Sequence, residues 1–551
     1  MYKLKLIALI VAVITSSGWS AATETKAFVL TTAKLKAYVE RFNADDEEMF
    51  SNIKNKDAYA FLENNIPLFD CPDEDFRRTY YFRWWTFRKH VKKTDDGYVV
   101  TEFLPNVSWA GKHNTISCPA AHHFYEGRWL HDTQVMDDYA TFWLRKGGSL
   151  RSYSFWIADA YYNRNLITPN DAFLIDLLPD LIDNYEAWQK GWVWPPWNKN
   201  HQVDIGQRAN GLFYTIDDRD GGEASIGKHG FRPTLNSFMY GDAKAIAQIA
   251  RMAGKDDIAA EYEKKASTLK KLIQEKLWDP EAKFFKILSA PHRKDLPSKN
   301  EALKDVRELY GYTPWYFNLP DPGYEAGWKE LMDPEGFYAK FGPTFAEQRH
   351  PHFKLSYEGH ECQWNGPSWP LATCSTLTAL ANLLNNYQQD VIGKDAYFET
   401  LKCYTRSHQL KRKDGKVVPW IDENIHPYTG DWIARTRLHE WARTDPDLAK
   451  RKGGPHRGKD YNHSTYNDLI ITGLVGLRPR ADNIIEVNPL IPENTWDYFC
   501  LDNVLYHGRV LTIIWDKTGE KYKKGRGLSV FADGEKIVNT EMLTRITVTL
   551  Q

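Results

Sequence analysis

The chain has almost no net charge. It contains 71 Lys and Arg residues against 72 Asp and Glu, which gives a formal charge of −1 at pH 7. Binding to nucleic acid or to an anionic membrane surface draws on an excess of positive charge, and this composition does not provide one. We therefore expect no nucleic acid partner and no membrane association of the mature protein.

Long hydrophobic runs are scarce, and no segment after the first residues has about 18 uninterrupted apolar positions. The apolar run Leu6–Ile14 follows the basic start Met1–Lys5 and precedes small and polar residues up to Ala22. This order is typical of a secretory signal peptide, and the run is too short to span a bilayer. We expect residues 1–22 to be removed and the mature protein to be periplasmic or secreted.

Cysteine is infrequent and shows no metal-binding spacing. Because no two cysteines form a C-x-x-C pair, the spacing does not favour a zinc ribbon. Export permits disulfides, but a chain of 551 residues does not need them, and the pairing stays open. The adjacent His122 and His123 rarely point at one ion without further ligands, so we predict no metal and no other cofactor. The cysteines are Cys71, Cys118, Cys362, Cys374, Cys403 and Cys500.

The dominant pattern along the chain is helical. It predicts a mainly α fold in which paired helices form a toroid, since no fixed-period repeat typical of a solenoid is present. The expected helical stretches are Ala33–Asn65, Asp73–Val91, Asp132–Lys146, Ser149–Arg164, Asn170–Lys190, Pro233–Ala253, Asp256–Leu277, Pro322–Met332, Ser368–Asn386, Ala396–Lys411 and Asn462–Leu474.

After about Arg480 the helical pattern gives way to a strand-like one. Short apolar or alternating runs separated by turns predict a small β-rich C-terminal module. We therefore divide the chain into a signal peptide (1–22), a helical catalytic domain (23–480) and a β-rich module (481–551). The expected strands are Ile484–Val487, Asp502–Tyr506, Arg509–Trp515, Gly527–Phe531 and Leu543–Leu550.

Two acidic motifs lie far apart in the sequence, each among aromatic residues and turn formers. One runs from Asp217 to Glu223 and includes Asp220, and the other begins Asp422-Glu423-Asn424. Two carboxyl groups that face each other across a sugar-sized gap can hydrolyse a glycosidic bond, one as general acid and the other as general base. The substrate would then be an oligosaccharide or a polysaccharide.

Four landmarks resemble the inverting (α/α)6-toroid glycosidases around glycoside hydrolase family 63, which include the mannosylglycerate hydrolases. In order, they are Asp220–Ser225, Arg232–Asp279, Trp364–Trp369 and Asp422–Gly430. This resemblance implies an (α/α)6 toroid and an inverting hydrolase of α-glycosidic bonds. It implies Glu423 as the general base and Glu223 as the general acid, with Asp220 as the alternative acid.

The resemblance also implies residues that bind the substrate. Arg128, Trp129 and Asp132 resemble the family's first sugar-binding loop, although a buried ion pair between helices is an equally common use of such residues. The tryptophans Trp194, Trp197, Trp364 and Trp369 could wall a sugar subsite or pack in the core. Asn365 stands where the family has Arg. His229, Arg232, His360 and His463 are further candidates for sugar contacts, with a structural role preferred.

Three other functions remain open. The first is a retaining glycosidase with a nucleophile, which a cysteine could supply. The second is a toroid polysaccharide lyase, which would use Tyr or His together with a charge-neutralising cation site. The third is a carbohydrate-binding protein without catalytic activity. The balanced charge and the Glu423 motif disfavour the lyase, and the presence of both acids disfavours a binding protein.

Overall fold

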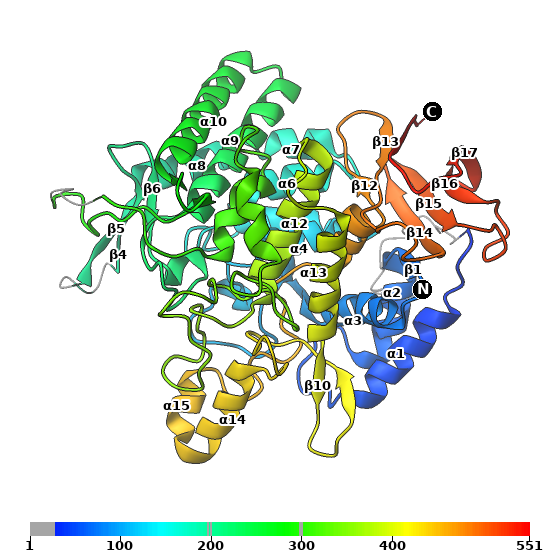
Figure 1. Cartoon of the computed structure of the whole chain (residues 1–551), viewed down its shortest axis with the longest axis horizontal. Coiled ribbons are helices and arrows are strands. Elements are labelled where there is room, and N and C mark those ends of the chain that lie inside the picture. Colours follow the sequence, from blue (N-terminus) through cyan, green and yellow to red (C-terminus); the bar gives the residue numbers. More distant parts are fainter. Residues whose placement is uncertain (1–27, 196–197, 199–200, 297–300, 551) are drawn as a thin grey trace, which may run out of the picture.

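The computed structural model describes residues 28–195, 198, 201–296 and 301–550 (Figure 1). The predicted signal peptide lies outside these residues. Within them, no helix is long and apolar enough to cross a membrane. All six cysteines are in the described part and are free thiols.

The inner helices form a closed ring. Helix α4 packs on α6, α6 on α9, α9 on α11, α11 on α12 and α12 on α16, while α16 contacts both α3 and α4. This closure is the predicted (α/α)6 toroid. The six helices of this ring are α4 (Ala120–Gly127), α6 (Ile157–Asn165), α9 (Pro233–Met252), α11 (Thr313–Tyr316), α12 (Pro370–Asn386) and α16 (Asn467–Leu469), and the largely buried α3 (Glu74–His90) packs on α16.

A second layer of helices covers the ring from outside, and the sequences of the two layers differ accordingly. Inner helix α9 has 16 buried residues out of 20. Its outer partner α10 (Asp256–Lys276) buries only one stripe, Ala259, Tyr262, Ala266, Leu269 and Ile273, at helical spacing. The other outer helices in contact with the ring are α1 (Ala33–Asp45), α2 (Ala58–Asn65), α5 (Gln134–Arg145), α7 (Asp171–Asp176), α8 (Leu178–Lys190) and α13 (Lys394–Ser407).

Several helix boundaries differ from those expected. The stretch Ala33–Asn65 contains two α-helices, α1 and α2, with a 3-10 helix (Asn55–Asp57) directly before α2. Asp46, the residue after α1, is held by Lys89 Nζ at 2.7 Å and Lys459 Nζ at 2.8 Å. Pro322–Met332 contains a 3-10 helix, Glu325–Leu331, and no α-helix. Helix α4 was not expected, since all its residues are buried and it shows no polar face. Helices α14 (Ile433–Thr444) and α15 (Pro446–Arg451) were also not expected.

The C-terminal region is the predicted antiparallel β module. Its larger sheet has the order β1-β14-β15-β16-β17, and β12, β13 and β18 form a smaller one. Strand β17 was not expected, since its side chains are mostly exposed. The strands are β12 (Leu477–Arg478), β13 (Ile484–Val487), β14 (Tyr498–Tyr506), β15 (Arg509–Asp516), β16 (Gly527–Ala532), β17 (Glu535–Thr540) and β18 (Ile546–Thr549).

The larger sheet takes its first strand from the other end of the chain. Strand β1 (Leu68–Asp70) pairs with β14, with Leu68 opposite Asp502 and Asp70 opposite Cys500. The backbone N–H groups of Val29 and Leu30 also donate to Asp502 Oδ2, at 2.6 and 2.7 Å. Figure 1 accordingly shows the C-terminal strands beside α1 and α2. The division at residue 480 stays a prediction, although β12 begins close to it.

Candidate active site

A cavity of about 390 Å³ lies where the loops that lead into the inner helices converge. Its walls come from segments that precede α4, α6, α9, α12, α14 and α16. Its volume is within the range of small-molecule sites. The lining residues are Glu102, Phe103, Trp109, Ile116, Cys118, Tyr153, Asp218, Arg219, Gly221, Glu223, His360, Glu361, Cys362, Trp364, Trp369, Glu423, Leu448, Arg451, Lys452, Arg457, Tyr461 and His463.

Glu423 is fixed in this wall by an ion pair with Arg457. Arg457 Nε donates to Glu423 Oε1 at 2.5 Å, and Nη2 donates to Oε2 at 2.8 Å. The Cys362 thiol also donates to Oε2, at 3.0 Å. Both charged side chains are buried, at 1% and 2% exposure. A two-pronged guanidinium contact fixes the plane of the carboxylate.

The backbone joins the three sequence motifs at this point. Ser368 and Ile425 exchange both hydrogen bonds, at 3.0 and 2.9 Å, and so hold the segment of Trp364 and Trp369 against that of Glu423. The Trp364 N–H donates to the carbonyl oxygen of Glu223 at 3.1 Å. The structure therefore brings Glu223, Glu423 and the tryptophan motif together, as the order of the landmarks suggested.

Glu223 has the raised pKa that a general acid needs near neutral pH. Burial raises the pKa of Glu223 to about 8, and the charge of Asp218 acts in the same direction. The preceding glycines serve packing: Gly221 has a φ of +61°, and a Cβ there would come within 2.7 Å of Cys118 Sγ. A carboxyl group with this pKa still carries its proton at neutral pH.

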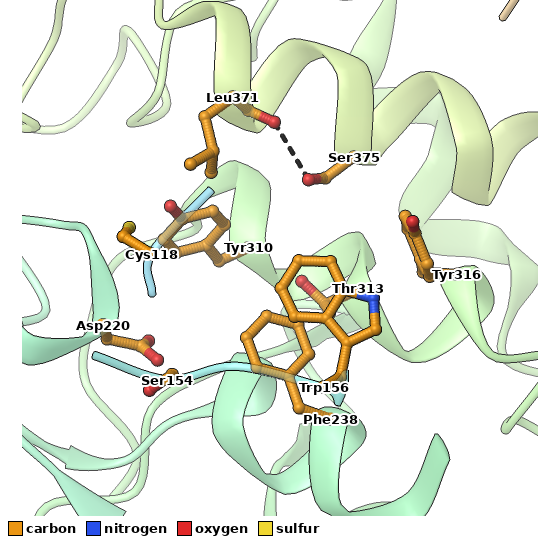
Figure 2. Close-up of a pocket in the computed structure, with 10 residues that line it drawn as sticks. All are labelled: Cys118, Ser154, Trp156, Asp220, Phe238, Tyr310, Thr313, Tyr316, Leu371 and Ser375. Atoms are coloured by element: carbon orange, nitrogen blue, oxygen red, sulfur yellow. Dashed lines mark hydrogen bonds between the residues drawn. The ribbon is translucent and has the colours of Figure 1, made fainter. Parts of the chain in front are cut away.

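Asp220 faces a different space. Its Oδ2 accepts from Arg232 Nε at 2.7 Å and from the Thr234 hydroxyl. Both charged side chains are fully buried. Figure 2 shows Asp220 next to Ser154 in the wall of a small cavity of about 10 Å³, with Tyr310 and Cys118 near it. Asp220 does not line the larger cavity, and its contacts are those of an anchor for the start of α9.

Of the predicted tryptophans, Trp197 lies outside the described residues, and the other three divide into two groups. Trp364 and Trp369 stack with ring centroids 4.0 Å apart and planes within 6°, and both line the cavity. Trp194 lies on β4 (Trp192–Trp194) outside the lining, where the Arg219 guanidinium covers its ring at 4.6 Å. Asn365 also lies outside the lining, and its carbonyl accepts from Lys354 N at 3.1 Å.

The predicted sugar-binding loop is not at the cavity. Arg128 donates to Asp468 Oδ1 from Nε at 2.9 Å and from Nη2 at 2.7 Å, and Trp129 Nε1 donates to the same oxygen at 2.7 Å. Asp132 accepts from the Gln134 N–H at 3.1 Å at the start of α5. These contacts tie α4 and α5 to their neighbours, which is the structural alternative that the sequence left open.

Several lining residues had not been predicted from the sequence. Glu102 follows a valine-rich strand, β3 (Gly97–Val100), and Arg457 lies in a glycine-rich loop. A charged residue just after an apolar strand, or in a Gly-Gly-Pro loop, is a weak indication of a functional site, since most such residues face solvent. Trp109, Tyr461 and Cys362 carried no local signal. Of the weighed histidines, His360 and His463 line the cavity.

One group of potential metal donors comes together in the described residues: His360, Glu361 and Cys362, with donor atoms within 4.8 Å of each other. Glu361 is already neutralised by Arg457 Nη1 at 2.9 Å and Lys452 Nζ at 3.0 Å. Arg457 also binds Glu423, and Lys452 Nζ lies 3.0 Å from His360 Nε2, so a divalent ion at this group would meet two cations. This group does not fit a metal site.

A closed ring of inner helices with carboxyl groups gathered in a cavity at one end places the chain among the six-hairpin glycosidases. A family model described as "Mannosylglycerate hydrolase MGH1-like glycoside hydrolase domain" matches residues 112–464, and the chain belongs to this family. The predicted resemblance is thereby confirmed. A second model, "Glycosyl hydrolase family 65, C-terminal domain", matches residues 477–539, which fall in the β module.

Two solved structures illustrate the likeness. One named "Sialidase" is 40% identical with a TM-score of 0.82, and the match covers 95% of this chain and 45% of that chain. This chain therefore spans less than half the length of that protein. A family 78 rhamnosidase of Bacillus sp. GL1 is 11% identical, with a TM-score of 0.51, over 83% of this chain and 41% of that chain. The second likeness concerns the fold alone.

Proposed function

We propose that the protein hydrolyses α-glycosidic bonds of oligosaccharides or polysaccharides with inversion of the anomeric carbon. The observation that carries this proposal is the contrast between two carboxyl groups in one cavity. Burial raises the pKa of Glu223 to about 8, whereas Glu423 is held in place by the Arg457 guanidinium. A carboxyl group with a raised pKa suits the general acid, which leaves Glu423 as the general base.

In this mechanism Glu423 takes a proton from a water molecule as that water attacks the anomeric carbon. Glu223 gives its proton to the glycosidic oxygen as the bond to the leaving sugar breaks. The stacked pair Trp364–Trp369 offers an aromatic wall for a sugar ring in the same cavity. The product leaves with the opposite anomeric configuration.

The test is a screen of α-linked oligosaccharides and 4-nitrophenyl glycosides, with the first product anomer identified by NMR. Sialosides belong in the screen because the 40%-identical structure carries the name "Sialidase". Inverted product that depends on Glu423 supports the proposal. An ultraviolet-absorbing unsaturated product would indicate a lyase instead, and glycan binding without any product would indicate a binding protein.

A retaining mechanism is the second candidate, because Cys362 Sγ lies 3.0 Å from Glu423 Oε2. Glu423 would then deprotonate the thiol, which would attack the anomeric carbon. Burial and the charge of Glu423 raise the pKa of Cys362 well above its ordinary value, which disfavours the thiolate. A glycosyl adduct on Cys362 in an intact mass spectrum, together with retained anomer, would establish this candidate over the first.

We further propose export to a periplasm or to the cell exterior, on the strength of the basic, apolar and small residues in 1–22. The measurement is the mass of the protein from the producing cells. An N-terminus near residue 23 in an exported fraction supports it, and an intact Met1 in the cytosolic fraction contradicts it.

A further inference from the structure

Glu102 is a further carboxyl group in the cavity, and the two-carboxyl mechanism does not use it. Its side chain is buried, with 4% of the residue exposed, and it lines the same cavity as Glu223 and Glu423. It lies ahead of residues 112–464, which the family model matches. Its backbone is held to the segment before α16, since the Asn462 N–H donates to the Glu102 carbonyl oxygen at 3.1 Å.

The two oxygens of Glu102 have different partners. Oε1 accepts from the Tyr461 hydroxyl at 2.7 Å and lies 3.2 Å from His463 Nε2. Oε2 is buried and has no hydrogen-bond partner in the described part of the chain. Since Oε1 is occupied by donors, a proton on this carboxyl group belongs on Oε2, where it would lack a protein acceptor. Buried polar groups of this kind are uncommon in native proteins and call for an explanation.

The surroundings of Glu102 favour that proton. Burial raises the pKa of Glu102 to about 8; the Tyr461 hydrogen bond opposes this, and the charge of Glu423 adds to it. Burial keeps the pKa of His463 well below its ordinary value, so its contact with Glu102 is a hydrogen bond of a neutral ring. The nearby cation, Arg457, is already bound to Glu423 and Glu361. The titratable or charged groups around Glu102 are Cys118, Tyr139, Glu223, Glu423, Arg457, Tyr461 and His463.

We propose that Glu102 contacts the substrate as a neutral carboxylic acid, donating a hydrogen bond from Oε2 to a hydroxyl oxygen of the bound sugar. The substrate class it selects is a glycoside with an acceptor oxygen at that position. Glu102 keeps its proton throughout the reaction, in contrast to Glu223. This inference rests on the proposed hydrolase function, because it needs a sugar in the cavity.

The protonation of Glu102 is tested without a substrate. Infrared difference spectra in heavy water compare the wild type with Glu102→Gln between pH 6 and pH 10. We expect a protonated-carboxyl C=O band that the variant lacks and that disappears from the wild type around pH 8. The difference spectrum between the wild type and Glu223→Gln identifies the band of the other protonated carboxyl group and serves as the control. If the variant is folded and the difference spectrum shows no Glu102 band at pH 6–7, the inference is overturned, whether or not any glycoside is cleaved.

The contact with substrate is tested on the 4-nitrophenyl glycoside that the screen selects and on the matching glycosyl fluoride. Glu102→Ala should lower kcat/KM roughly 10-fold or more, by the same factor on both substrates, because no proton transfer is lost. Glu102→Gln, which keeps a donor, should recover part of that loss. A loss in Glu102→Gln that is large on the nitrophenyl glycoside and small on the fluoride would make Glu102 the general acid and overturn the assignment. Equal kcat/KM for the wild type and Glu102→Ala would also overturn it. An inactive wild type would instead be a failure of the proposed hydrolase function.

Discussion

Arg457 holds both oxygens of Glu423, from Nε at 2.5 Å and from Nη2 at 2.8 Å, while its Nη1 donates to Glu361 at 2.9 Å. One guanidinium therefore orients the proposed general base and balances a second buried carboxylate beside it. The position of Glu423 depends on a residue of a different loop, 34 positions further along the chain. Changes in either partner should affect catalysis and stability together.

The first prediction concerns the base. Glu423→Gln should lower turnover by several orders of magnitude, because general base catalysis alone contributes roughly 10²–10⁴-fold. The amide keeps the shape of the side chain but cannot accept the proton of water. Substrate binding should persist, and calorimetric titration of the variant with the best oligosaccharide of the screen measures it. A variant that turns over at a rate near that of the wild type would contradict the assignment of Glu423.

The second prediction concerns pH and the acid. The raised pKa of Glu223, about 8, keeps the acid form present below that pH, so kcat/KM should fall as the pH rises through about 8. Glu223→Gln should lose activity mainly on substrates with poor leaving groups and little on glycosyl fluorides. Profiles of kcat/KM from pH 5 to pH 10 on both substrate types measure this. The same loss on both substrates would exclude Glu223 as the proton donor.

Asp220→Asn should act on stability. Breaking this buried ion pair leaves Arg232 with Glu308 alone, whose Oε2 lies 3.9 Å from Nη2, and removing one partner of a buried pair costs up to about 3–5 kcal/mol. Thermal unfolding monitored by circular dichroism should therefore show a lower Tm, with no dependence of the remaining activity on the leaving group. If Asp220→Asn instead shows that dependence and Glu223→Gln does not, Asp220 is the general acid.

The fourth prediction concerns acid stability. Burial alone would raise the pKa of Glu361, but Arg457, His360 and Lys452 lower it to about 2, below its ordinary value of 4.5. A lowered pKa stabilises the folded state above pH 4.5, and the contribution is lost as the pH falls through 2. It amounts to about 3 kcal/mol. Glu361→Gln should thus be less stable at pH 7, and denaturant unfolding should show the gap to the wild type closing toward pH 2. A gap of constant size would contradict this origin.

Local pattern was sufficient for part of the site. The Asp422–Gly430 motif was predicted because its turn residues and its carboxylate are neighbours in sequence, and α10 was predicted from its single apolar stripe. Helix α4 was missed for the opposite reason, since it is buried on all sides. A buried helix has no periodicity to read.

Partners distant in sequence account for what could not be predicted. Arg128 and Trp129 have the chemistry to bind sugar hydroxyls, yet both bind Asp468, which lies about 340 positions away. Glu102 owes its place to Tyr461 and Asn462, at a similar separation. Nothing adjacent to these residues in the sequence distinguishes the two outcomes, because the fold alone brings their partners near.

The pairing of β1 with β14 also bears on how the protein is made. During synthesis, residues 68–70 leave the ribosome more than 400 residues before the strand that completes their hydrogen bonds. Contacts of such long sequence separation form slowly, and unpaired strand edges attract other chains in the meantime. The nascent chain must therefore keep this edge shielded until strand β14, residues 498–506, has emerged. Ribosome-bound chains stopped just before residue 498 should be the ones that a chaperone or an aggregating partner captures most.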